Sequence, residues 1–120
     1  MKATNDYFRD KVMIITGASS GIGLACARLF ASRGALLVLA SRNIGKLNQI
    51  AEEVTDDPSR ILCVKTDVSV EEDCRNMIDA AVRKFGRIDV LVNNAGISMR
   101  APFADVDLKV IKRLMDVNFW

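Results

Sequence analysis

Three glycines and two serines lie where an apolar run of the sequence gives way to an amphipathic one. The segment TGASSGIG, residues 16–23, follows VMII and precedes LACARLFASRG. Glycine weakens both strands and helices, so this density of glycines indicates a turn whose backbone must stay bare. N–H groups at the start of a helix bind anions, with help from the helix dipole. The segment therefore favours a nucleotide phosphate as ligand over the alternative, a tight turn with a purely structural role.

Each residue of this segment has an expected task. Gly17 permits a tight exit from the strand, Gly21 lets a phosphate approach the backbone, and Gly23 lets the helix pack closely on the sheet. Ser19 and Ser20 add hydroxyl donors to the same turn. No Gly-Lys-Ser/Thr sequence follows the glycines, which disfavours nucleotide binding of the Walker type.

The elements that must position this segment alternate along the chain. Buried strands are predicted for four apolar runs, at residues 11–17, 35–40, 61–66 and 89–92. Helices are predicted between these runs, at residues 22–33, 44–54 and from a Ser69–Glu72 capping box to Gly86. A last helix is expected to begin near Asp105 or Asp107 and to be truncated at Trp120.

Alternation of strand and helix at this spacing builds βαβ units with right-handed crossovers. The predicted fold is therefore α/β, a doubly wound parallel sheet with helices on both faces in three layers, αβα. Ligands of such sheets sit at the carboxyl ends of the strands, where the glycine segment also lies.

Composition limits the possible function classes. The 120 residues, half of them hydrophobic, suit one domain spanning residues 1–120, and the net charge of +2 favours neither nucleic acid nor a membrane surface as partner. The start of the chain lacks the apolar core of a signal peptide. Three cysteines without metal-ligand spacing, in a chain without histidine, predict reduced thiols in the cytoplasm, no metal site and no catalytic cysteine.

Four motifs in order resemble the short-chain dehydrogenase/reductase family. They are TGASSGIG, the DV pair at 67–68, NNAG at 93–96 and DVNFW at 116–120, so the resemblance covers essentially the whole chain. It implies a Rossmann-type fold and a nicotinamide cofactor that exchanges hydride with a small alcohol or carbonyl substrate.

The resemblance also implies roles for individual residues. The pyrophosphate would be lined by Gly17, Ser19, Ser20, Gly21, Ile22 and Gly23. Asp67 would accept a hydrogen bond from the adenine amino group, and Val68 would flank the ring. The riboses would be supported by Asn93, Asn94, Ala95 and Gly96. Read without the resemblance, Asp67 could cap a strand end, and the asparagine pair could form an ordinary turn.

The end of the second predicted strand bears on the choice between NAD and NADP. An NAD site usually places an acid there for the ribose 2′-hydroxyl, but this strand ends LASRN without a carboxylate. The residues expected at the 2′-phosphate are Ser41, Arg42 and Asn43, with Arg42 as the ion-pair partner. A solvated surface arginine is the alternative. NADP is therefore the predicted cofactor, although Ser20 stands where some NADP-preferring relatives carry a basic residue.

The family's catalytic Y-x-x-x-K motif is absent, and the only tyrosine is Tyr7. Asn118 alone matches a catalytic position, where the family holds a proton-relay water, and a helix asparagine without a role is the alternative. We expect an NADP-dependent oxidoreductase, a homodimer or homotetramer, of which these 120 residues are an inactive cofactor-binding half. The alternative is a non-catalytic nucleotide-binding module or an inactive truncated product.

Overall fold

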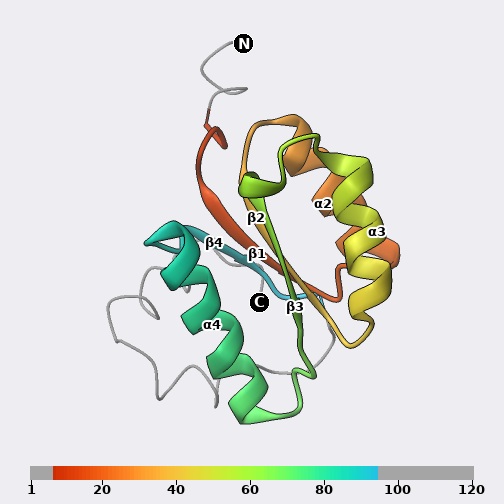
Figure 1. The fold of residues 1–120 in the computed structure, drawn as a ribbon, viewed down its shortest axis with the longest axis vertical. Helices are drawn as coiled ribbons and strands as arrows, with labels where there is room; N and C mark the ends of the chain where they lie inside the picture. Colours follow the sequence, from red (N-terminus) through yellow and green to blue (C-terminus); the bar gives the residue numbers. More distant parts are fainter. Residues whose placement is uncertain (1–6, 95–120) are drawn as a thin grey trace.

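The computed structural model describes residues 7–94, in which strands and helices alternate as predicted (Figure 1). The elements in chain order are β1 (Val12–Thr16), α2 (Gly21–Ser32), β2 (Leu36–Ser41), α3 (Ile44–Val54), the 3-10 turn η1 (Pro58–Arg60), β3 (Ile61–Lys65), α4 (Glu71–Phe85) and β4 (Val90–Val92). The four strands fall within one or two residues of their expected bounds. The helix expected near Asp105, and with it Asn118, lies outside the described residues.

All paired strands are parallel, in the order β3-β2-β1-β4. Ile14 at the centre of β1 pairs with Val38 of β2 on one side and with Leu91 of β4 on the other. The chain thus adds strands in one direction from β1 to β3 and then returns to the opposite side of β1. This reversal is the switch point at which doubly wound sheets open a crevice for a ligand.

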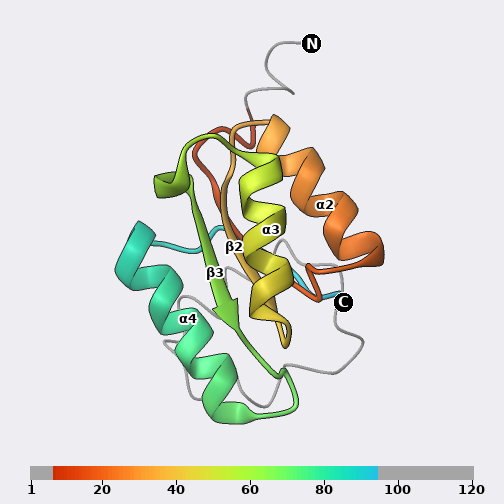
Figure 2. The same ribbon diagram turned by 45° about the vertical axis from the view of Figure 1, so that its right-hand side comes forward.

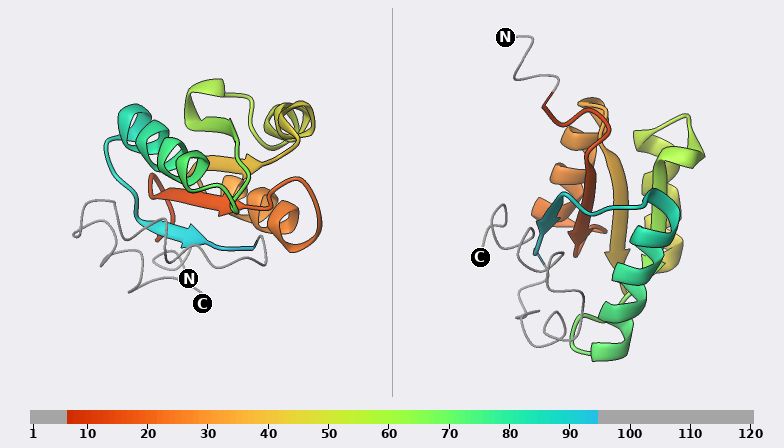
Figure 3. Two further views of the ribbon diagram at one scale, coloured as in Figure 1. Left: turned by 90° about the horizontal axis from the view of Figure 1, so that it is seen from below. Right: turned by 90° about the vertical axis from the view of Figure 1, so that its left-hand side faces the viewer.

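Helices cover both faces of the sheet, as the apolar strands predicted. Figure 2 shows α2 and α3 side by side on one face, and Figure 3 shows α4 on the other. Successive side chains of β1 alternate between two apolar clusters: Met13 and Ile15 pack with the α2 and α3 side, and Ile14 packs with the α4 side. Every residue of β1 is buried, as expected for a parallel strand covered on both faces. The fold is a three-layer αβα sandwich of Rossmann type.

The start of α4 differs from the prediction. The N-cap residue is Val70 and not Ser69, and Val70 makes no side-chain capping bond. The Ser69 hydroxyl instead donates to Asp67 Oδ1 at 2.6 Å. The Ser69–Glu72 capping box is therefore wrong, because a carboxylate two residues upstream takes the serine hydroxyl that would have capped the helix.

Candidate cofactor site

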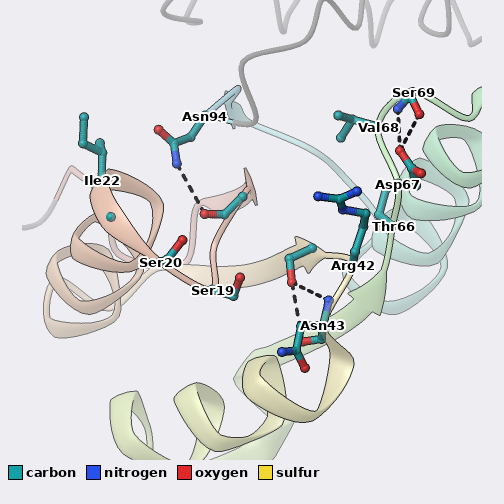
Figure 4. Close-up of a pocket in the computed structure, with 13 residues that line it drawn as sticks. Ser19, Ser20, Ile22, Arg42, Asn43, Thr66, Asp67, Val68, Ser69 and Asn94 are labelled. Carbon is teal, nitrogen blue, oxygen red and sulfur yellow. Dashed lines mark hydrogen bonds between the residues drawn. The ribbon is translucent and has the colours of Figure 1, made fainter.

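A cleft of about 610 Å³ lies at the carboxyl ends of the strands (Figure 4). It brings together the turns that follow β1, β2 and β3 with the first residues after β4. Most predicted cofactor residues line it, namely Gly17, Ser19, Ser20, Gly21, Ile22, Ser41, Arg42, Asn43, Asp67, Val68 and Asn94. Gly23 and Asn93 are not among its lining residues, and Ala95 and Gly96 lie outside the described residues.

Two lining residues, Thr66 and Ser69, were not predicted. Both flank the DV pair directly, so their closeness to Asp67 in the sequence was the available signal. Thr66 is buried, and its N–H donates to the Ser41 carbonyl oxygen at 2.8 Å, which ties the end of β3 to the end of β2.

The first turn of α2 faces this cleft with its N–H groups uncapped. The first N–H groups of any helix lack partners inside the helix. Ser20, the N-cap residue, makes no side-chain bond to them, and the first turn contains no acidic residue. The turn is formed by Gly17 and Gly21, whose φ angles of 61° and 59° lie in the left-handed region. The arrangement gives an anion a set of N–H donors and the positive end of a helix dipole.

Gly23 packs closely against the Gly17 end of the turn. A Cβ atom at Gly23 would lie 2.2 Å from the Gly17 carbonyl oxygen and 2.7 Å from Asn94 Nδ2. At Gly21, by contrast, a Cβ atom would meet nothing within 4 Å among the residues that the structure describes. Gly23 is therefore needed for the close approach of α2 to the end of β1, whereas Gly21 borders open space.

Thr16, at the end of β1, joins the glycine turn to the residues after β4. Its Oγ1 accepts a hydrogen bond from the Asn94 N–H at 2.9 Å. The same hydroxyl can donate to the Val92 carbonyl oxygen or to Asn93 Oδ1, each at 3.4 Å. The Asn94 side chain donates in turn to the Gly17 carbonyl oxygen at 3.3 Å. Asn93 thus faces Thr16 and Asn94 reaches the cleft. This role of Thr16 could not be predicted from the sequence, because its partners lie more than seventy residues away.

The turn after β2 presents one charged side chain. Arg42 is exposed, and Figure 4 shows its guanidinium group extending into the cleft. Its two neighbours are engaged locally: the Ser41 hydroxyl accepts the Asn43 N–H at 3.1 Å, and Asn43 Oδ1 caps α3 by accepting the Lys46 N–H. Of the three residues expected at a 2′-phosphate, Arg42 is thus the one whose polar group extends into the cleft.

Asp67 lies on the same side of the cleft as Arg42, in the turn that follows β3 (Figure 4). Its Oδ1 accepts the Ser69 N–H at 3.0 Å and the Ser69 hydroxyl at 2.6 Å. These hydrogen bonds from Ser69, with a smaller contribution from the positive charge of Arg42, lower the pKa of the Asp67 carboxyl below its ordinary value. Asp67 is therefore an ionised hydrogen-bond acceptor at neutral pH.

Other kinds of site find no support in residues 7–94. No group of three or more metal-ligating side chains occurs there, and no helix in this range is long and apolar enough to cross a membrane. The three cysteines are free, and burial raises the pKa of the Cys63 and Cys74 thiols. A raised pKa keeps a thiol protonated and poorly nucleophilic, so neither cysteine is suited to covalent catalysis.

A family profile described as short chain dehydrogenase matches residues 11–120. The curated 11-beta-hydroxysteroid dehydrogenase A of Sesamum indicum is 47% identical over 112 residues, which cover 92% of this chain and 32% of the relative. This chain thus spans about a third of the length of that relative.

The solved structures similar to this chain include two short chain dehydrogenases. A short chain dehydrogenase from Bacillus anthracis is 38% identical with a TM-score of 0.69, over 89% of this chain and 44% of its own. A short chain dehydrogenase/reductase from Burkholderia phymatum, in complex with NAD, is 40% identical with a TM-score of 0.70, over 75% of this chain and 32% of its own.

Proposed function

The chain belongs to the short-chain dehydrogenase family, and on that premise we propose that residues 1–120 form the cofactor-binding part of an NADP-dependent oxidoreductase. The observation that carries the proposal is the uncapped first turn of α2, which opens on a cleft with Arg42 at another wall. A phosphate-rich dinucleotide is the ligand that matches N–H donors, a helix dipole and a guanidinium group in one cleft.

The bound nicotinamide would supply the hydride acceptor or donor for an alcohol or carbonyl compound. The chain's own residues bind and orient the cofactor. The N–H groups of the α2 first turn hold the pyrophosphate, with Ser19 and Ser20 as further donors and Ile22 beside them. Asp67 accepts a hydrogen bond from the adenine amino group, and Val68 flanks the ring. The riboses lie against Asn94 and the residues around it, namely Asn93, Ala95 and Gly96.

Preference for NADP over NAD is the finer part of the proposal. No carboxylate follows β2 at the place where an NAD site binds the ribose 2′-hydroxyl. Arg42 extends into the cleft there, and a guanidinium group forms strong charge-assisted hydrogen bonds with a phosphate. The NAD in the Burkholderia phymatum relative belongs to that protein, so the preference of this one needs its own measurement.

The acid/base chemistry would come from elsewhere in the whole protein. Tyr7, the only tyrosine, precedes β1 and so lies at the edge of the sheet opposite the cleft; its ring contacts Phe8 and Lys11. We assign Asn118 to the proton-relay water by resemblance, and a tyrosine–lysine pair to sequence beyond Trp120. The whole protein would act on a small alcohol or carbonyl compound in the cytoplasm as a homodimer or homotetramer. Free cysteines support a reducing compartment.

The test is titration of the full-length protein with NADPH and with NADH, followed by cofactor fluorescence. Tighter binding of NADPH is expected. Equal affinity for both cofactors contradicts the NADP preference, and binding of neither contradicts the cofactor site itself. The coding sequence beyond Trp120, inspected for Y-x-x-x-K, distinguishes the oxidoreductase from a non-catalytic nucleotide-binding module.

A further inference from the structure

We propose that Asp73, on the first turn of α4, is a positioning residue for the adenine end of the cofactor. Its carboxylate holds the turn from Asp67 to Val70, so that Asp67 faces the cleft. Asp73 does not itself line the cleft. The inference rests on the function proposed above, because it assigns Asp67 to the adenine amino group.

The contact that carries the inference joins α4 to the backbone of Asp67. The Asp67 N–H donates to Asp73 Oδ2 at 2.9 Å, a bond that spans six residues. Asp73 is the third residue of α4, so its carboxylate reaches back over the start of the helix. A rigid helix thereby fixes the peptide group immediately before the Asp67 side chain.

Other bonds fix the remaining parts of the same turn. The Val70 N–H donates to the Asp67 carbonyl oxygen at 2.9 Å, and the Cys74 thiol donates to the Val68 carbonyl oxygen at 3.5 Å. Ser69 holds one oxygen of the Asp67 carboxylate, through Oδ1. Among the described residues, Asp73 is the group that holds the Asp67 N–H.

These contacts leave one carboxylate oxygen for a ligand. Oδ1 of Asp67 already accepts two hydrogen bonds from Ser69, whereas Oδ2 accepts none from residues 7–94. An amino group is a donor, so Oδ2 is the oxygen that suits it. The direction in which Oδ2 points depends on the Asp67 backbone. The aspartate side chain has only two rotatable bonds, and Ser69 already holds its other oxygen, Oδ1, in place.

Asp73 differs in this respect from its neighbours on the same turn of helix. Glu71, Glu72 and Asp73 all place negative charge at the positive end of the α4 dipole. Glu71 pairs with Arg75 on the helix surface, and Glu72 is exposed. Glu72 therefore provides a matched control, because its removal changes the helix charge without touching the cleft wall.

The test compares two cofactors that differ only at the adenine. NADPH carries the 6-amino group, and its hypoxanthine analogue carries a carbonyl oxygen in its place. Dissociation constants for both are measured by fluorescence titration of the full-length protein and its variants. The unchanged protein is expected to bind NADPH more tightly than the analogue, because the carbonyl oxygen that replaces the amino group cannot donate a hydrogen bond to Asp67.

In Asp73→Ala, NADPH binding is expected to weaken by roughly threefold to tenfold, the worth of one hydrogen bond, with little change for the analogue. Asp73→Asn is expected to keep most of the preference, because its amide oxygen still accepts the Asp67 N–H. Glu72→Ala is expected to leave both affinities unchanged. If Asp73→Ala does not fold, Asp73→Ser replaces it, since serine suits a helix start but its hydroxyl falls short of the Asp67 N–H.

An unchanged preference in Asp73→Ala, or in Asp73→Ser where that variant replaces it, overturns the inference. Equal weakening of both cofactors also overturns it, because a merely structural role would not distinguish the two bases. An unchanged protein that binds both cofactors equally refutes the Asp67–adenine contact and the inference with it, but leaves the NADP-binding function standing. An unchanged protein that binds neither cofactor refutes the proposed function itself.

Discussion

Arginine side chains lie at both the amino and the carboxyl edge of the sheet. Arg60 and Arg87 at the amino edge are hydrogen-bonded within the fold, whereas the Arg42 side chain at the carboxyl edge has no hydrogen-bond partner among residues 7–94. At the amino edge, Arg87 donates to Asp89 Oδ1 at 2.6 Å, and Arg60 donates to Asp10 Oδ1 and to the Gly34 carbonyl oxygen, both at 2.7 Å. At the carboxyl edge, Arg42 extends into the cleft.

The two edges differ in the same way in the hydrogen bonding of their backbone N–H groups. The buried Asp89 carboxylate accepts the Val12 N–H at 2.9 Å, at the start of β1. The first turn of α2, just after the end of β1, has no side-chain cap. Satisfied groups stabilise a fold, and groups left open to solvent remain available to a ligand. The amino edge therefore contributes to stability, and the carboxyl edge leaves polar groups available to a ligand.

The largest effect is expected at Gly23, because this residue of the carboxyl edge is closely packed and also supports the glycine turn. Gly23→Ala should lower the free energy of unfolding by about 3 kcal/mol, the upper end for overpacking, because the clash at 2.2 Å is with the Gly17 backbone. Cofactor affinity should fall with it, since the α2 first turn must move. Chemical denaturation and NADPH titration measure the two losses.

Gly21→Ala is the matched variant on the open side of the same turn. It should cost about 1–2 kcal/mol of stability, the strain of an alanine in a left-handed conformation, and should still fold. Its Cβ atom would project into open space at the cleft, so NADPH affinity should fall more than stability accounts for. Unchanged affinity in folded Gly21→Ala would mean that the turn is only structural.

Arg42→Asp tests the carboxyl edge without touching the fold. NADPH binding should weaken by about 1.5–3 kcal/mol, the worth of a hydrogen bond to a charged group, and NADH should become the better ligand. Stability should stay the same because Arg42 is exposed. Arg28→Asp makes the same charge change on an exposed arginine outside the cleft, and it should leave the ratio of the two affinities unaltered.

Asp89→Ala tests the amino edge and should give the opposite pattern. It leaves the Val12 N–H and Arg87 without their acceptor, so the free energy of unfolding should fall by about 1–3 kcal/mol. NADPH affinity of the folded variant should be unchanged. The exposed Asp79→Ala on α4 serves as control, with neither quantity altered. Loss of cofactor affinity in Asp89→Ala, at unchanged stability, would show that the amino edge contributes to binding and not to stability.

The smallest effect expected is the pH dependence of adenine recognition by Asp67. The folded-state pKa of Asp67 lies below its ordinary value of 3.8, so its contribution to stability is present above pH 3.8 and is lost as the pH falls through the lowered pKa. The preference for NADPH over its hypoxanthine analogue should therefore stay constant between about pH 5 and 8. A preference that declines within that range would show that another group governs recognition of adenine.

Periodicity and turn chemistry were enough to predict the elements. Apolar runs of strand length, each followed by a helical pattern, led to the parallel sheet, and the strand bounds agree within one or two residues. Gly86 was expected to end a helix and does so in the left-handed conformation, with φ of 80°. These features depend on local backbone preferences and on burial, which neighbouring residues largely determine.

The prediction failed where side chains compete for the same polar group. Ser69 has the spacing of a helix cap, yet its hydroxyl bonds to Asp67. The Ser41 oxygen accepts the Asn43 N–H, a local bond that the sequence did not indicate, and the role of its hydroxyl as a donor to a phosphate stays a prediction. Sequence shows which donors and acceptors are near one another, but the choice among them depends on backbone angles that the surrounding elements impose.

Residue types alone were enough to predict the αβα fold and the glycine-rich turn, because strand burial, helix periodicity and the freedom of glycine depend on them directly. Which polar groups are already bonded could be seen only in the packed structure. Asp89 accepts the Val12 N–H across 77 residues, and Thr16 accepts the Asn94 N–H across 78. Hydrogen bonds act over about 3 Å, so pairings between elements exist only after the elements have packed.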